Sequence, residues 1–261
     1  VTDTAFHATD NTVTIAATTL SGIGNATTGT VTVSNAIKVE GSVTQLTEAL
    51  VSGGKIVSAG IAKVTVTDTA FHATDNTVTI AATALSAIGN VTTGAVTVSN
   101  AIKVEGTTTQ LTEALVSGSK TVSAGTAKVT VTDAAFHATD NTVTIAATTL
   151  SGIGGATSGT VTLKNKVRIS GAQSEVTTAL IGGSSVVASQ AATEAVVTNA
   201  VNASQGAAIA DVSKITGIFS GGLTDSVGNL VTGVTTSANL NTVTTEDTDI
   251  NITVSDSAFH A

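Results

Sequence analysis

Residues 5–18 read AFHATDNTVTIAAT, and the same fourteen residues return from Ala70 and again from Ala135, at an interval of 65 residues each time. A shortened copy, SDSAFHA, stands at residues 255–261. A fixed interval of this length is typical of proteins in which each repeat packs on its neighbours. The repeat is therefore the first guide to the fold.

The interval divides the chain into repeats of unequal similarity. The first two are nearly identical, the third begins in the same way, and the rest keeps only partial likeness to them. We expect one array over residues 1–261, with bounds at 1–65, 66–130 and 131–160 onward, and divergent repeats over 161–261.

Each 65-residue repeat contains three segments in which Val or Ile alternates with Thr or Ser. They are TVTIAATTLSG from Thr12, TVTVSNAIKVEG from Thr30 and KIVSAGIAKVTV from Lys55. Alternation with a period of two is typical of a strand with one buried face. The sequence therefore predicts an all-β fold with short helical connectors, a parallel β-solenoid of about three coils per repeat.

One connector, SVTQLTEALVSGG, has the spacing of a helix. Val43, Leu46 and Leu50 recur on one helical face, Ser42 is a candidate N-cap, and Gly53 is a candidate stop. The alternative architecture is a string of small β-sandwiches, but 65 residues are few for a sandwich of roughly 100. We expect an aliphatic core formed by these residues and their partners 65 positions later: Val13, Ile15, Leu20, Val31, Val33, Ile37, Val39, Ile56, Ile61, Val64 and Val66.

The composition excludes several classes of protein. Charged residues make up 11% of the chain, the net charge is −8, and Arg168 is the single arginine, so a nucleic-acid partner is not expected. The sequence has no cysteine and no apolar run long enough to span a membrane. No motif for a nucleophile, a phosphate loop or a zinc site is present, so the sequence predicts a protein that is not an enzyme.

The AFHA elements supply a phenylalanine and a histidine to each repeat. A metal array is one interpretation of the histidines, but equivalent residues three coils apart would lie roughly 14 Å from one another, far beyond a coordination bond. We expect the phenylalanines to be buried anchors with the histidines beside them. The anchors are Phe6, Phe71, Phe136 and Phe259, and the histidines are His7, His72, His137 and His260.

Aspartate and asparagine recur at the predicted turns. Asn35, Asn100 and Asn165 share one corner position, where their amides would bond to backbone. We expect no cofactor. Calcium remains the alternative, although neither the nonapeptide calcium repeat nor an EF-hand loop is present. Its candidate ligands are Asp3, Asp10, Asp68, Asp75, Asp133 and Asp140.

The VTVTDTAF, SVTQLTEAL and ITVSDSAF elements resemble those of very large extracellular repeat proteins of bacteria, cyanobacteria especially, known as β-strand-repeat, haemagglutinin-like or adhesin-like proteins. The resemblance implies a secreted or surface-attached protein with a structural or adhesive role, and cell-surface glycans are its candidate partners. It carries no catalytic residues over to this chain.

We expect an extracellular structural protein that forms a surface fibre, sheath or matrix filament. Val1 is in register with Val66, and Ala261 is in register with Ala8, so copies could associate head to tail into an open filament. One alternative is an adhesin stalk that acts as a spacer. Another is an ice-binding protein, since Thr-x-Thr triplets recur along the strands.

Overall fold

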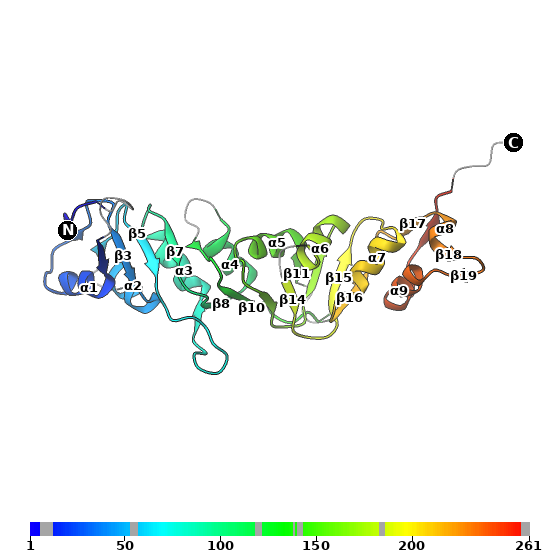
Figure 1. Cartoon of the computed structure of the whole chain (residues 1–261), viewed down its shortest axis with the longest axis horizontal. Helices are drawn as coiled ribbons and strands as arrows, with labels where there is room; N and C mark the ends of the chain where they lie inside the picture. The colour runs from blue at the N-terminus through cyan, green and yellow to red at the C-terminus, as the bar shows by residue number, and fades with distance from the viewer. Residues whose placement is uncertain are drawn as a thin grey trace. The chain divides into compact units, whose positions relative to one another are not determined.

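The computed structural model describes residues 1–5, 13–52, 57–117, 122–137, 139, 143–182 and 186–256. Within these residues, helices alternate with short strands that pair mostly in parallel (Figure 1). The chain is therefore a mixed α/β protein. Its helices are α1 (Ala17–Asn25), α2 (Val43–Leu50), α3 (Ala82–Asn90), α4 (Thr108–Leu115), α5 (Ala147–Gly155), α6 (Gln173–Leu180), α7 (Ala203–Ala210), α8 (Val227–Leu230) and α9 (Ala238–Glu246).

The predicted all-β fold, a parallel β-solenoid, is wrong because strands alternate with helices along the chain, and in each full repeat a helix takes the place of part of the first expected strand segment. The segment TVTIAATTLSG is predicted to be a strand segment, but it is a strand only at Thr14–Ala16 and continues as α1. Ala17, Leu20, Ser21 and Gly24 are its buried residues. Their spacing of three, four and seven positions is that of one helical face. The buried residues therefore follow the 3.6-residue period of a helix and not the two-residue period of a strand.

The second helix is the one that the sequence predicts, and it is confirmed. α2 begins after Ser42, whose side chain accepts a hydrogen bond from the backbone N–H of Gln45, while the Gln45 side chain accepts one from the Ser42 N–H. This reciprocal capping box satisfies two backbone donors at the helix start. Leu46 and Leu50 are fully buried.

The chain divides into two compact units. The first comprises Val1–Thr130 with Ala156–Thr160, and the second Val131–Gly155 with Val161–Ala261. Strands of the first unit, with β10 at its boundary, are β1 (Thr14–Ala16), β2 (Val31–Thr32), β3 (Lys38–Gly41), β4 (Val57–Ser58), β5 (Lys63–Val66), β6 (Thr79–Ala81), β7 (Val96–Val98), β8 (Lys103–Gly106), β9 (Val122–Ser123) and β10 (Lys128–Val131).

One sheet of the first unit crosses the boundary between two repeats. Its order is β1-β3-β5-β7-β9, and its strands are parallel. The first three strands come from the first repeat, and β7 and β9 come from the second. The equivalents of β7 and β9 one repeat earlier are β2 and β4, which pair with each other in a separate two-stranded sheet. Successive repeats are thus interlocked by shared sheets.

The second unit continues the alternation of helices and strands. Its sheets have the orders β11-β13-β15-β16, β17-β20 and β18-β19, and β12 pairs with β14; only β18-β19 is antiparallel. The strands are β11 (Thr144–Ala146), β12 (Val161–Leu163), β13 (Arg168–Gly171), β14 (Val186–Ala188), β15 (Thr193–Val197), β16 (Ile215–Ile218), β17 (Leu223–Asp225), β18 (Val231–Thr232), β19 (Thr235–Thr236) and β20 (Ile252–Val254).

The expected aliphatic core is confirmed in most of its positions. Of the residues named for the first copy, Ile15 and Val31 are half-buried, and the buried ones are Leu20, Val33, Ile37, Val39, Val64 and Val66. Burial of each such side chain is worth roughly 1.5–3 kcal/mol. The prediction is wrong for Val13, Val78 and Ile61, which are exposed. The two valines precede the strands that they were expected to join, and Ile56 lies outside the described residues.

Candidate functional site

The AFHATDN loop of the second repeat is closed by its own backbone. His72 and Asn76 exchange two backbone hydrogen bonds of 2.8 and 3.1 Å in an antiparallel bridge. The Asn76 amide also donates to the carbonyls of Thr69 and Ala70, each at 3.0 Å. The His72 and Asp75 side chains are exposed. The loop is therefore held by Asn76, and not by its titratable side chains.

The phenylalanine of this loop lies beneath cationic side chains of the neighbouring strands. The Phe71 ring is half-buried, and the ammonium groups of Lys103 and Lys128 stand 5.4 and 5.6 Å from its centroid. Phe136 is buried, with the Arg168 guanidinium carbon 3.9 Å from its centroid. Cation–π contacts of this kind fix the loop to the strands.

The other predicted anchors cannot be placed in the same way. Phe6 and Phe259 lie outside the described residues, as do His7 and His260. His137 is exposed. The fifth phenylalanine, Phe219, is 2% exposed; the repeat comparison missed it because it stands in the divergent part of the chain.

Aspartate and asparagine side chains cap helices that precede them in the sequence. The backbone N–H of Val43, the first residue of α2, donates to Asp68 Oδ2 at 2.7 Å. The same arrangement recurs where the first residues of α6, α7 and α8 donate to a side chain 22 to 29 residues later. The pairs are Gln173 with Asn199, Ala203 with Asp225, and Val227 with Asp256. A helix N-terminus favours such acceptors.

These caps bear on the calcium candidates. In the described part of the chain, no three His, Asp or Glu side chains gather in a way that could hold a metal ion. The Asp68 carboxylate is engaged by α2, and Asp75 is exposed. Asp10 and Asp140 lie outside the described residues.

The corner asparagines bind backbone. The side-chain amides of Asn35, Asn100 and Asn165 donate to the carbonyls of Asp3, Asp68 and Asp133, at 2.6, 2.8 and 2.7 Å. Each amide thus joins two segments that lie 32 residues apart in the sequence. The three bonds repeat with the sequence, as expected of a structural element.

A pocket of about 250 Å³ lies at the start of α2. Its lining is mainly polar, but Ser42, Gln45 and Asn76 are used by the helix cap and the loop, and Asp68 caps α2. These four side chains are thus already hydrogen-bonded within the protein. The lining residues are Ser42, Gln45, Thr67, Asp68, Thr69, Asn76 and Val78.

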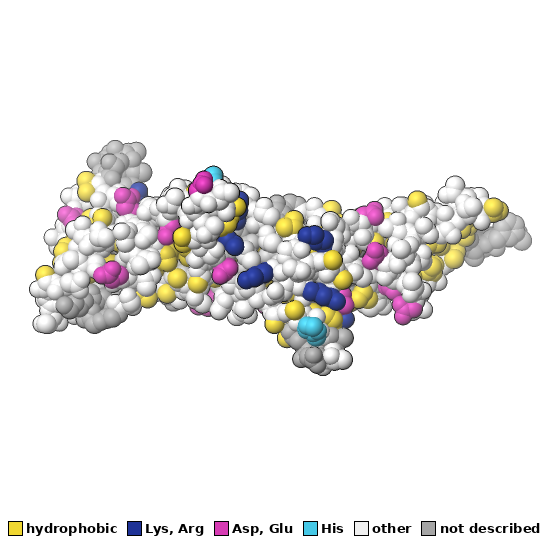
Figure 2. Space-filling view, turned by 90° about the horizontal axis from the view of Figure 1, so that it is seen from below, with side chains coloured by type: hydrophobic (Ala, Val, Ile, Leu, Met, Phe, Trp, Pro, Cys, Tyr) yellow, Lys and Arg dark blue, Asp and Glu magenta, His cyan; other side chains and the backbone are white. Residues whose placement is uncertain are grey.

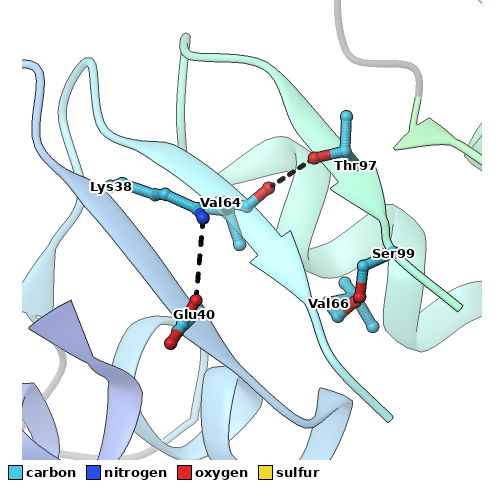
Figure 3. A network of polar contacts seen from close by, with 6 residues as sticks. All are labelled: Lys38, Glu40, Val64, Val66, Thr97 and Ser99. Carbon is cyan, nitrogen blue, oxygen red and sulfur yellow. Dashed lines mark hydrogen bonds and ion pairs between the residues drawn. The ribbon is translucent and has the colours of Figure 1, made fainter. Parts of the chain in front are cut away.

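The outward face of the interlocked sheet is polar but not a uniform threonine array. Figure 3 shows Lys38 and Glu40 as an ion pair, with 3.7 Å between Nζ and Oε2, and Thr97 donating to the Val64 carbonyl. Along one row of paired positions, Ala16, Glu40, Thr65, Thr97 and Ser123 follow one another. Only two of these five positions are threonines, and Glu40 stands beside them.

The edge of β2 is the first of two strand edges that bear on assembly. β2 pairs with β4 on one side. On the other side, the Val1 amino group donates to the Thr32 carbonyl at 2.7 Å, and the Ser34 N–H donates to the Val1 carbonyl at 3.1 Å. No strand of the described residues pairs with β2 on this side. We call this side of β2 the acceptor edge.

One repeat later, the same edge is filled by β5. Val64, Thr65 and Val66 pair with the three residues of β7, and the Ser99 N–H donates to the Val66 carbonyl at 3.1 Å. Val1–Asp3 therefore occupies the place that Val66 and the two residues after it occupy one repeat later. On the acceptor edge, no described residue takes the places of Val64 and Thr65.

β20 supplies the second strand edge. It pairs with β17 on one side, and among the described residues it has no strand on the other, which we call the donor edge. Ile252 is 43% exposed and Val254 is 56% exposed, whereas Val64 and Val66 at the equivalent positions of β5 are fully buried. Hydrophobic side chains are also visible on the surface near the C-terminal end (Figure 2).

Comparisons with family models, curated proteins and solved structures find no match to this chain. No helix of the described residues has both the length and the apolar character needed to cross a membrane.

Proposed function

We propose that this chain is a structural protein of the cell exterior, without catalytic activity, which builds a surface fibre, sheath or matrix filament by head-to-tail pairing. The observation that supports this is the sheet β1-β3-β5-β7-β9, which continues across a repeat boundary by strand pairing. A contact that joins repeats within the chain can join copies of it in the same way, and a head-to-tail contact does not close on itself.

The surface chemistry fits a structural role. On the face that Figure 2 shows, most of the described surface is uncharged. Backbone ladders and aliphatic packing would therefore carry the association, so assembly should change little with salt. The extracellular location rests on the resemblance to large bacterial repeat proteins.

Sedimentation velocity over a concentration series, with negative-stain electron microscopy of the same samples, tests the proposal. We expect linear particles that lengthen as the concentration rises. Assembly should be equal in calcium and in EDTA, since the proposal needs no cofactor. A protein that stays monomeric up to millimolar concentration would contradict it.

The second candidate is a stalk that holds another domain away from the cell. The observation that favours it is that sheets shared between successive repeats join them by strand pairing, as a continuous stalk requires. Images of the native material separate the two functions: isolated stalks support a spacer, and continuous polymers support a filament. Ice binding is not carried forward, because charged Lys38 and Glu40 occupy positions paired with Thr14 and Thr65 on this face.

A further inference from the structure

Lys103 and Lys128 place two like charges on adjacent strands. β10 lies beside β8 in its sheet, and the Lys128 N–H donates to the Ile102 carbonyl at 2.8 Å. The corresponding bond in the first repeat belongs to the directly paired lysines Lys38 and Lys63. Like charges that face each other across two strands destabilise a sheet. The second repeat therefore holds its two lysines together at a cost to its stability.

No acidic side chain of the described residues compensates this pair. Neither ammonium group forms an ion pair or a hydrogen bond with a described residue. Glu105 lies two residues after Lys103 on the same face of β8, but outside ion-pairing range. Both ammonium groups lie over the Phe71 ring. The ring attracts cations through its quadrupole without neutralising them, so the pair keeps its positive charge.

The third repeat shows which kind of group neutralises these positions. Arg168 and Glu194 are directly paired on β13 and β15, in the places that the two lysines take on β8 and β10. Glu194 Oε2 lies 2.8 Å from Nε and 2.7 Å from Nη2 of Arg168, whose guanidinium lies over the Phe136 ring. The third repeat thus supplies its own carboxylate. In the second repeat, an anion from outside the chain can take the same part.

We propose that Lys103, Lys128 and Phe71 form a binding site for the carboxylate or sulfate group of an acidic polysaccharide. The anion bridges the two ammonium groups through charge-assisted hydrogen bonds, which offset the repulsion between them. The half-buried Phe71 ring leaves an apolar surface for the sugar that carries the anion. The choice of a polysaccharide rests on the proposed extracellular function, whereas the anion site rests on the lysine pair.

The charge of the chain favours this ligand over a nucleic acid. The net charge is −8, and the chain has one arginine. A DNA duplex carries one phosphate charge per roughly 1.7 Å and binds to clusters of Lys and Arg, so most of this chain would repel it. A polysaccharide with its charges on separate sugars can place a single anion at the lysine pair.

Acetylation footprinting locates the anion on the wild-type protein. The sequences around Lys103 and Lys128 differ from those around Lys38 and Lys63, so mass spectrometry of the peptides measures each lysine separately. Polygalacturonate is the probe, neutral dextran is the control, and free galacturonate is the monomeric anion. We expect polygalacturonate to slow the acetylation of Lys103 and Lys128, less so as salt is raised, and dextran to have no effect.

The monomeric anion separates the two sources of the charged group. Protection by both galacturonate and polygalacturonate supports the site and its ligand. Protection by galacturonate alone would mean that the lysines take only a free anion, and would overturn the polysaccharide. Protection by neither would overturn the site.

Lys128→Glu reproduces the arrangement of the third repeat. A carboxylate beside Lys103 would take the place of the ligand. The polygalacturonate concentration that half-protects Lys103 should therefore rise about tenfold or more. The substitution should also raise the urea midpoint, because it turns a like-charge pair into an ion pair. Lys128→Arg keeps the charge and should retain the protection of Lys103.

Lys164→Glu is the matched control, since it makes the same change in net charge at an exposed lysine of the second unit. It should leave the protection of Lys103 unchanged. An equal loss from Lys128→Glu and Lys164→Glu would mean that net charge alone governs binding, and the site would be wrong. Single-stranded DNA that protects Lys103 as strongly as polygalacturonate would also contradict the proposal.

Filament formation, measured in the same samples, keeps this site distinct from the proposed function. If the wild type forms filaments but its lysines are not protected, the polysaccharide site is wrong and the filament stands. Protection in a protein that stays monomeric supports the site and contradicts the filament. Both are supported if the protein forms filaments and the protection is lost in Lys128→Glu but retained in Lys128→Arg and Lys164→Glu.

Discussion

Arg168 is held by two partners at once. Its Nε and Nη2 lie 2.8 and 2.7 Å from Glu194 Oε2, and its guanidinium lies over the Phe136 ring. The two charged residues are directly paired on β13 and β15. The equivalent pair in the first repeat, Lys38 and Lys63, carries like charges. The third repeat has thus gained a charge-assisted bond where the first has none between these positions.

A double-mutant cycle measures this gain. We expect Arg168→Ala and Glu194→Ala to be coupled by about 1 kcal/mol in urea unfolding, because the pair is only partly exposed and its geometry is close. The matched cycle on Lys38 and Glu40, a longer and more exposed pair, should give about 0.3 kcal/mol. Equal coupling in the two cycles would contradict the prediction.

Asp225 links stability to pH. Hydrogen bonds from the Asn229 side chain, and from the backbone N–H groups of Ala203 and Ser226, lower the pKa of its carboxyl against the opposing effect of burial. Because the folded pKa lies below the unfolded value of about 3.9, the contribution is complete above that value. It is lost as the pH falls through the folded pKa.

Asp225→Asn should therefore cost about 1–2 kcal/mol at neutral pH and progressively less below about pH 4. Urea unfolding of both proteins from pH 7 to pH 3 measures the difference. Asp247 provides a control of opposite sign: burial raises its pKa, although the Phe219 N–H bonds to it. Because a raised pKa means that ionised Asp247 destabilises the fold, the wild type should gain stability relative to Asp247→Asn as the pH falls. The free-energy cost of Asp247→Asn should therefore grow at low pH, whereas that of Asp225→Asn shrinks.

At the scale of elements, α1 shows where sequence patterns fail. Thr12–Ile15 alternates as a strand does, and β1 forms at Thr14–Ala16, but the following Ala-Ala-Thr-Thr-Leu fits either a bend or a helix. α2 was predictable because Ser42 and Gln45 form a capping box and its apolar residues have helical spacing. α1 has no side-chain cap, and threonine, a poor helix former, fills its exposed face. Tertiary burial of Leu20 decides its conformation.

The helix caps that distant aspartates provide could not be predicted from the sequence either. Asp68 and Asp225 reach α2 and α7 across 25 and 22 residues, so no local pattern identifies them. The sequence could show that Asp68 recurs at a fixed interval and stands at a turn. Only the folded arrangement shows that the carboxylate is occupied by a helix N-terminus.

Gly94 tests how closely successive segments are packed. A Cβ at this position would lie 2.2 Å from the Ala62 carbonyl oxygen, which is backbone and cannot swing away. Gly94→Ala should therefore lower the free energy of unfolding by about 1–3 kcal/mol. Gly29→Ala, at the equivalent position of the first repeat, should leave it unchanged within about 0.5 kcal/mol. A large loss from both variants would mean that the glycine serves the local turn and not the packing.

At the scale of the molecule, the interlocked sheets explain what an alternation pattern could not reveal. β5 pairs with β7 and not with β6, the next strand in sequence, which pairs with β8 in another sheet. Periodicity identifies strands, but it does not say which repeat completes a sheet. The sequence therefore predicted parallel strands and a shared aliphatic core, and missed the exchange of strands between repeats.

Because successive repeats share sheets, the effect of a deletion on stability should depend on where the deletion begins and ends. Removal of residues 66–130 joins Thr65 to Val131, and residues 131–163 closely match residues 66–98. β5 would then meet the third repeat's equivalents of β7 and β9 in an unchanged register. We expect a cooperatively folded protein whose urea m-value is about a quarter smaller, because 65 of 261 residues are removed.

The matched control removes residues 66–98 instead, which is about half of a repeat. This deletion truncates β5 and removes β6, α3 and β7 together, so the sheet that three strands of the first repeat began cannot be completed. Although it discards half as many residues, it should lower the urea midpoint further than the deletion of a whole repeat. If the two variants unfold in the order of their lengths, stability is a sum over residues, and the sharing of sheets between repeats contributes nothing to it.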